Sequence, residues 1–431
     1  MQSGDVRLFF LSISLIPLWW ILGVDFIIYH IFSLYFIVKY PRMFLPDDAR
    51  KLSLLMVVVL LGVGLVVSAV TMDYEAFRYI AAFNNMSVLF VGYCYYSLVV
   101  NILLSSSNNF FMLWRSVFPI SIVYILLSIV LFYFVAGDSS ASVVVPTFLG
   151  LVTPDAPGLL GQYQKAILVS SNWFMGEDHS RLFILAPYAT GTAIVGCCAA
   201  FISLAYLHRR GLGLSGRVLF LLVMFVGVML TLSRATIAGY ILAMAVVSCS
   251  ALSFRLLVLL LPMIPVFIVL IFPYFMGVLD AGLESRQGST DTRMFSYMLS
   301  FKIVMEENIL TGIGVKPRFE HMLIPVGSHS TFVGLFVRGG ALALVFAIFF
   351  FILVPSYRCL QIYKARLTQS DVLSKEGIYI VACYICCALF LIFQDVDAYP
   401  TLCVLVLVTI ATLESVARTL IKESAPALIR V

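Results

Sequence analysis

The chain has 431 residues, of which 62% are hydrophobic and only 11% are charged, and its formal net charge is +5. A soluble domain carries about 25% charged residues, so this composition excludes an ordinary soluble domain and indicates an all-α integral membrane protein. The basic residues fall mostly between apolar segments, so we interpret their excess as membrane topology and predict no nucleic-acid partner.

The predicted elements are membrane-spanning helices. A helix needs about 20 apolar residues to cross a bilayer, and about twelve stretches of the chain approach that length. They lie near residues 8–22, 24–39, 52–71, 79–104, 113–135, 184–207, 218–233, 235–252, 256–278, 331–355, 378–394 and 398–417. The first two are short and suit a tight hairpin, and the pair near Arg234 is interrupted at that arginine.

Lysine and arginine favour the cytoplasmic loops of membrane proteins, so their distribution predicts orientation. An N-in, C-in arrangement makes the loops alternate consistently and leaves most of these residues inside. The same arrangement places Arg234, Arg293 and His329 together on the outer side. Because the choice of orientation did not use these three residues, their agreement supports a shared site.

Two long outer segments divide the chain. One covers residues 136–183 and is rich in Gly, Pro and Ser, and the other covers residues 279–330. We therefore expect three parts. These are the N-terminal spans with the first long outer loop (1–183), a core that contains the second loop (184–355), and a cytoplasmic loop with the last two spans (356–431).

The second outer loop predicts an amphipathic helix. Ser289–Asp291 supplies N-cap residue types, and Gly312 and Gly314 break the helical pattern. Apolar residues recur between them at helical spacing, namely Met294, Phe295, Met298, Phe301, Val304 and Met305. Such a helix is expected to lie at the membrane interface.

Three basic residues are candidates for chemistry. Arg234 sits between two apolar runs, Arg293 lies near the start of the predicted amphipathic helix, and His329 lies at the outer mouth of a span. A guanidinium offers a planar fork of donors to phosphate, and a histidine can accept a proton near neutral pH.

Each candidate also has a structural interpretation. Arg234 could snorkel to the interface, Arg293 could be a solvated helix residue, and His329 could simply be a structural histidine. His179 and His321 are rival histidines on the same face.

Metal chemistry has weaker support. Cys383-x-x-Cys386-Cys387 has spacing that could suggest metal or redox chemistry, but inside a span we interpret it as packing by small polarizable side chains. The outer acidic residues are mostly dispersed, and Asp395 and Asp397 could pair internally. We therefore predict no metal site.

Three segments in order resemble a known superfamily, that of the O-antigen ligases and Wzy-type polymerases of bacterial envelopes. The first is Leu230–Ala235, with a serine-arginine step at a span end. The second is Asp291–Arg293, followed by a helix and the glycine turn Leu310–Gly314. The third is Gly327–Phe332 around the histidine, followed by Gly339–Gly340 in the next span.

This resemblance implies a GT-C-like, metal-independent, inverting glycosyltransferase without a cofactor. Its donor would be a glycan linked to undecaprenyl diphosphate. Arg234 and Arg293 would hold the diphosphate, with Arg181 and Arg286 as additional contacts. His329 would deprotonate or orient the hydroxyl of the acceptor sugar.

The leading hypothesis is a polymerase that assembles O-antigen or exopolysaccharide repeat units on the outer face of the inner membrane. The alternative is a ligase that transfers the glycan to lipid A-core, and a second alternative is a lipid or glycan transporter. Many ligases carry asparagine after the histidine, and Ser330 at this position leans towards polymerases. The expected partners are the lipid-linked donor, the glycan or lipid A-core acceptor, and membrane lipids.

Overall fold

The computed structural model describes residues 1–137, 142–154, 161, 163–172, 177–251, 287–319, 325–368 and 372–428. The first helices are α1 (Ser3–Ser14), α2 (Ile16–Leu22), α3 (Asp25–Lys39), η1 (Pro41–Phe44), α4 (Ala49–Thr71), α5 (Ala76–Ser105), α6 (Asn108–Gly137) and α7 (Phe148–Val152). The central helices are α8 (Ala189–Arg209), α9 (Leu214–Met229), α10 (Arg234–Ala251) and α13 (Gln287–Glu307). The last are α14 (Thr331–Ile348), η4 (Phe349–Leu353), α15 (Val354–Thr368), α16 (Val372–Phe393), η5 (Val396–Ala398) and α17 (Pro400–Leu428).

Seven of the described helices are long and apolar enough to cross a membrane, and the bent pair α1–α2 gives an eighth if it counts as one span. The shorter apolar helices α9 and α10 lie either side of the break predicted at Arg234. The prediction of a helical, multi-pass membrane protein is confirmed. The number twelve stays a prediction, and the expected span at 256–278 lies outside the described residues.

The first outer loop holds a small sheet that the sequence analysis did not assign. Strands β1 (Val143–Pro146), β2 (Lys165–Asn172) and β3 (Glu177–Leu182) form an antiparallel sheet in the order β1-β2-β3. Val144 pairs with Ile167, and Ser170 pairs with Arg181. Because β1 spans only four residues, the strand is too short for a periodic pattern to stand out among the turn residues of this loop.

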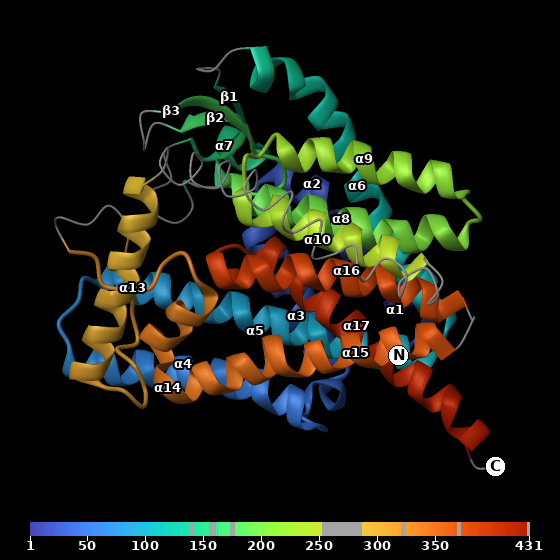
Figure 1. Cartoon of the computed structure of the whole chain (residues 1–431). Helices are drawn as coiled ribbons and strands as arrows, with labels where there is room; N and C mark the ends of the chain where they lie inside the picture. The colour runs from blue at the N-terminus through green and yellow to red at the C-terminus, as the bar shows by residue number, and fades with distance from the viewer. Residues whose placement is uncertain are drawn as a thin grey trace, which may run out of the picture.

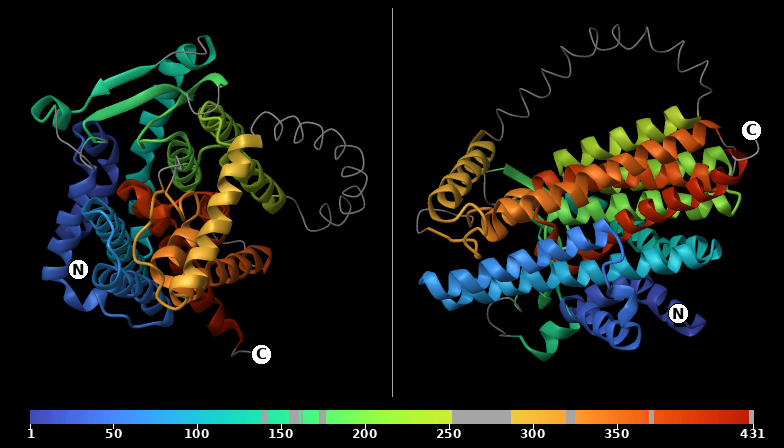
Figure 2. Two further views of the ribbon diagram at one scale, coloured as in Figure 1. Left: turned by 90° about the vertical axis from the view of Figure 1, so that its left-hand side faces the viewer. Right: turned by 90° about the horizontal axis from the view of Figure 1, so that it is seen from below.

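The long helices run side by side, and α13 lies across one end of their bundle (Figure 1). Two further views show the same crosswise placement (Figure 2). Both α10 and α14 begin at the end of the bundle where α13 lies (Figure 1). Helix α17 is the central one, since every residue of its apolar window is buried. The prediction of a separate helix in this segment is thus confirmed, although α13 begins at Gln287, before the predicted caps. Its amphipathic character and its position at the membrane interface stay predictions.

A break in α14 receives the glycine turn that follows α13. Gly340 has a φ of 70°, which interrupts the helix. The Ile313 N–H donates to the Val337 carbonyl at 2.8 Å, and the Ala341 N–H donates to the Ile309 carbonyl at 2.8 Å. The backbone groups that the break leaves without helical partners therefore hydrogen-bond to the turn.

Glycine is required where these backbones meet. Gly312 has a φ of +66°, and a Cβ there would lie 2.6 Å from the Gly340 nitrogen. Gly314 has a φ of +72°, and a Cβ there would lie 2.7 Å from the Ser68 Cβ on α4. A side chain at either position would separate the turn from the helices behind it. The predicted end of the amphipathic helix is confirmed, and packing on α4 and α14 explains it.

A small apolar core joins α13 to α14. Its buried members come from α13, the loop after it and α14, namely Val304, Ile313, Val326, Phe336 and Val337. Phe301 is partly exposed and contacts Phe336 of this core. Met294, Phe295, Met298 and Met305 are exposed, and so are Lys302 and Glu306. The helix is therefore attached along one side and presents several exposed apolar side chains elsewhere.

Ion pairs tie together helix ends that carry predicted cytoplasmic residues. Glu414 of α17 is almost fully buried, and its carboxylate accepts from the Arg358 Nε at 2.8 Å. Arg50 and Arg418 contact the same carboxylate. All three arginines belong to the set that the N-in arrangement places inside. Because removing Glu414 would leave several cations close together, this cluster favours one packing of α4, α15 and α17.

The glycine contacts generate a stability prediction. We expect Gly312→Ala to lower the free energy of unfolding by about 2–5 kcal/mol, because it adds a clash to left-handed strain. Gly211→Ala is the matched control, since Gly211 has a φ of +81° and open space around it. It should cost only about 1 kcal/mol. Thermal unfolding in detergent would measure both, and equal shifts would contradict the close approach described above.

Candidate functional site

The turn that carries His329 is fastened to α13. The Tyr297 hydroxyl of α13 donates to the His329 carbonyl at 2.7 Å. The Gly327 N–H donates to the Ser300 hydroxyl at 2.9 Å. Ser330 then caps α14, because its hydroxyl accepts from the Val333 N–H. His329 is therefore held between α13 and the start of α14.

The backbone at His329 is strained. Among the described residues other than glycine, three have positive φ: Leu185 at 63°, Leu232 at 51° and His329 at 67°. Such conformations cost about 1–3 kcal/mol and persist where surrounding contacts fix them. Leu232 lies two residues before Arg234, so two of the three strained positions fall in predicted site motifs. This distribution favours a functional role for both turns.

The surroundings of His329 keep its imidazole neutral. Burial, then the positive charges of Arg293 and Lys316, lower its pKa from 6.5 to about 4, against a polar interaction with the Gln394 side chain that raises it. The ring is thus unprotonated at neutral pH, as a proton acceptor must be. Arg293 is thus close enough to His329 for its charge to affect the imidazole, and a shared substrate site stays a prediction.

Arg234 and Arg181 lie near a common turn. Arg234 is exposed and begins α10, where the helix dipole favours anions. The turn before it contacts β3, since the Leu182 N–H donates to the Leu230 carbonyl at 3.0 Å. Arg181 is the half-buried neighbour of Leu182. Contact between either arginine and His329 stays a prediction.

Some predicted residues lie beyond what the structure describes. Arg286 and the rival His321 fall outside the described residues. His179 lies on β3, but its side chain is also outside the description. Their expected roles therefore stay predictions.

Two ion pairs, Lys316–Asp395 and Arg338–Asp397, involve residues that were not predicted to belong to the site. Lys316 Nζ lies 2.9 Å from an Asp395 carboxylate oxygen, with side chains 12% and 13% exposed. Arg338 of α14 pairs with Asp397, and both are buried. The expectation that these carboxylates pair within the protein is confirmed. Gly334 leaves room for the first pair, since a Cβ there would lie 2.9 Å from both partners.

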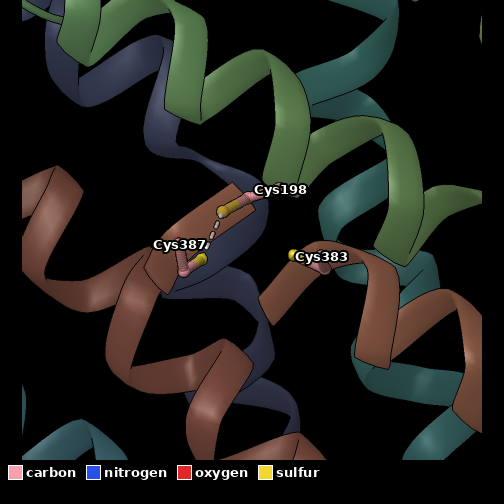
Figure 3. Close-up of side chains that lie close together, drawn as sticks. All are labelled: Cys198, Cys383 and Cys387. Carbon is pink, nitrogen blue, oxygen red and sulfur yellow. Dashed lines mark hydrogen bonds between the residues drawn. The ribbon is translucent and has the colours of Figure 1, made fainter. Parts of the chain in front are cut away.

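Three buried thiols form the one group of possible metal ligands found among the described residues (Figure 3). Cys198 of α8 faces Cys383 and Cys387 of α16, with 3.7 Å between the sulfurs of Cys198 and Cys387. Thr409 of α17 lies 3.4 Å from the Cys383 sulfur. Cys383 and Cys387 stand out in the sequence by their spacing, but only the helix packing brings Cys198 to them.

The thiol cluster fits packing better than metal binding. Three thiolates around a soft cation would leave net negative charge at a fully buried position among spanning helices, which is costly. Neutral thiols behave as small apolar groups and can hydrogen-bond weakly to one another and to Thr409. We therefore keep the sequence-based interpretation of these residues.

Comparison with known protein families adds direct evidence. Residues 218–348 match the family model described as O-antigen ligase. This match supports the resemblance of the segment to the O-antigen ligase and Wzy-type superfamily. It contains Arg234, Arg293 and His329. None of the curated proteins matches the chain.

The family match of residues 218–348 and the helical fold indicate the same kind of protein. Together they support a multi-pass membrane enzyme that handles glycan in O-antigen biosynthesis. The matched segment covers α9, α10, α13 and α14, which include the helices that carry the candidate site.

The packing interpretation of the thiols can be tested. We expect Cys198→Ala to lower the free energy of unfolding by about 1 kcal/mol, through loss of a small buried group, and to leave glycan assembly unchanged. Thermal unfolding and metal analysis of the purified protein would check this. A stoichiometric metal that is present in the wild type and absent from the variant would contradict it.

The electrostatic surroundings of His329 predict a pH dependence. Its reaction with diethyl pyrocarbonate, followed at the His329 peptide, should be half-maximal near the pKa of about 4. Lys316→Met should move this midpoint to higher pH, because it removes a positive charge that disfavours the imidazolium. Lys302→Met is the matched control, since Lys302 is 69% exposed. Equal midpoints in all three proteins would contradict the role of Lys316.

Proposed function

We propose that this chain is a glycosyltransferase that polymerises undecaprenyl-diphosphate-linked repeat units into O-antigen or exopolysaccharide. The observation that carries the proposal is the buried, unprotonated imidazole of His329 in a strained turn, close enough to Arg293 for that positive charge to lower its pKa. These groups suit the two halves of glycosyl transfer, which are stabilisation of a leaving phosphate and removal of a proton.

The donor side requires positive charge. As the bond from the anomeric carbon to the diphosphate oxygen breaks, negative charge grows on the leaving diphosphate. Arg234 and Arg293 would bind it with forked hydrogen bonds, and the amino end of α10 would add the helix dipole. Arg181 and Arg286 are proposed as further contacts.

The acceptor side requires a base. The hydroxyl oxygen of the acceptor sugar would attack the anomeric carbon on the face opposite the diphosphate, which inverts the configuration. A new carbon–oxygen bond forms, and the hydroxyl proton passes to His329. A pKa near 4 keeps the imidazole unprotonated in the resting protein, but it also makes the ring a weak base. The negative charge of the arriving diphosphate would raise this pKa towards the working pH and so strengthen the base.

The proposal needs no metal or other cofactor. Arg293 and Lys316 are both close enough to lower the pKa of His329. Lys316 is paired with Asp395, so the positive charge offered to a ligand would come from the arginines. This charge would repel a divalent cation and can itself neutralise the diphosphate. The chemistry then depends on side chains alone.

The position of α13 suits a lipid-linked donor. Its exposed apolar side chains would rest in the outer interface of the inner membrane, next to Arg293 on the same helix. The active site would then face the periplasm, with both chain termini in the cytoplasm. A polyprenyl chain could stay in the bilayer while its diphosphate reaches the arginines.

A ligase is the second candidate, and the description of the matched family favours it. A ligase would use the same donor chemistry and transfer the finished glycan to lipid A-core. A transporter, the remaining alternative, would move intact substrate and would not require His329 as a base.

The glycans of cells lacking the gene would test the proposal. We expect single repeat units in place of long chains, and complementation by wild type but not by His329→Ala. Lipid A-linked and carrier-linked glycans would be resolved by size, with Ser328→Ala as the neighbouring control. Long chains stranded on the carrier would instead indicate a ligase. Normal glycans with His329→Ala would exclude this histidine as the base and favour transport.

The phosphate role of Arg293 predicts sensitivity to a conservative change. Arg293→Lys keeps the charge but loses the planar fork, so we expect glycan assembly to fall at least about 10-fold. Lys302→Arg, an exposed change on the same helix, should have no effect. Wild-type activity of Arg293→Lys would show that charge alone suffices.

A further inference from the structure

We propose that the end of the helix bundle away from His329 binds the phosphate of an anionic lipid headgroup, between Arg217 of α9 and Lys375 of α16. This inference is independent of glycosyl transfer, because it concerns residues that have no part in the candidate site. Three features carry it: a guanidinium that is fixed but not neutralised, a lysine beside it, and an exposed apolar surface next to the guanidinium.

Hydrogen bonds and helix direction place this end of the bundle. Thr190, in the first turn of α8, accepts from the Gln394 side-chain amide at 3.3 Å, so α8 begins where α16 ends. The end of α8 and the start of α16 therefore lie together at the other end of the bundle, away from α13 (Figure 1). Because both helices are long and apolar enough to span a membrane, their ends are expected at the depth of the lipid headgroups.

Arg217 is held at this end by neutral partners. Its Nη1 donates to the Tyr379 hydroxyl of α16 at 2.8 Å, and also to Nδ1 of His208 in the last turn of α8. A guanidinium cannot accept a hydrogen bond, so this imidazole nitrogen carries no proton. Neither partner is a carboxylate, and Arg217 forms no ion pair with any other described residue. Its charge is therefore fixed in place without being neutralised.

Lys375 lies beside Arg217. Residues four apart on a helix share a face, so Lys375 is a neighbour of Tyr379, which bonds directly to Arg217. The adjacent carboxylate, Glu376, is engaged by Arg209 through two hydrogen bonds of 2.9 and 3.0 Å. Lys375 is half-buried. Within the described part of the chain, neither Lys375 nor Arg217 is paired with a carboxylate.

The arginine cluster around Glu414 has the opposite arrangement. There three arginines share one buried carboxylate, and Arg418 also pairs with Asp48. Those charges are satisfied within the protein. At Arg217 and Lys375 the like charges repel one another, and a bound anion would relieve the repulsion. Phosphate suits these cations, because guanidinium and ammonium groups both bind it.

The surface next to Arg217 favours a lipid over a soluble phosphate. Apolar side chains on α9 and in the turn before it are exposed, namely Leu212, Leu214, Val218, Leu219 and Leu222. Basic residues immediately beside apolar spanning segments attract anionic lipid headgroups. An anionic phospholipid would place its phosphate on the two cations and its acyl chains along α9.

The lipid selectivity of the purified full chain tests the proposal. The protein would be reconstituted in phosphatidylcholine vesicles, and its association with spin-labelled phosphatidylglycerol would be compared with that of spin-labelled phosphatidylcholine. We expect the wild type to prefer phosphatidylglycerol. Lys375→Met should weaken this association about 5-fold, as expected for the loss of one cation near a lipid surface.

Two further variants serve as controls. Lys375→Arg keeps the charge and should keep the preference for phosphatidylglycerol. Lys302→Met removes an exposed lysine of α13, away from the proposed site, and should leave the preference unchanged. Because Lys375 forms no ion pair with another described residue, Lys375→Met should also unfold at the wild-type temperature. That measurement separates lipid binding from stability.

Three results would overturn the proposal. Equal association of the two lipids with the wild type would mean that the cations do not select a headgroup. Equal weakening in Lys302→Met would assign the preference to overall surface charge. Full displacement of phosphatidylglycerol by millimolar inorganic phosphate would identify a site for a soluble anion instead of a lipid.

Discussion

The break in α14 at Gly340 is the constraint on which the candidate site depends. It frees backbone groups that bind the turn after α13, and only glycine allows the turn to approach so closely. That turn fixes the end of α13, and α13 in turn holds the His329 carbonyl through Tyr297. The orientation of the candidate base therefore follows from a helix defect about ten residues further along the chain.

Charge is used differently in two parts of the bundle. Around Glu414, three arginines converge on a buried carboxylate, and the interaction fastens helix ends together. Around His329, Arg293 and Lys316 act on a neutral ring and depress its pKa. In the first case the charges compensate one another within the protein. In the second, Lys316 is compensated by Asp395, and Arg293 is the cation proposed to meet an anionic ligand.

The predictable part of the site is the part that local sequence controls. Arg234, Arg293 and His329 stand out because charged or titratable residues near spans are rare and costly. Gly312 and Gly314 stand out because glycine ends a helical pattern. Gln394 and Lys316 carry no such signal, since a polar residue at a span end is ordinary. Their proximity to His329 depends on how α16, α14 and the loop after α13 pack.

The sequence by itself determined that this is a helical membrane protein, where most of its spans lie, and which superfamily its central segment resembles. These follow from composition and local periodicity, which need no long-range contact. Only the tertiary structure decided that the charge of Arg293 reaches His329, that Cys198 joins the cysteines of α16, and that the first outer loop contains a sheet. Each of these brings together residues distant in the chain, and helix and strand packing, rather than local preference, sets such pairings.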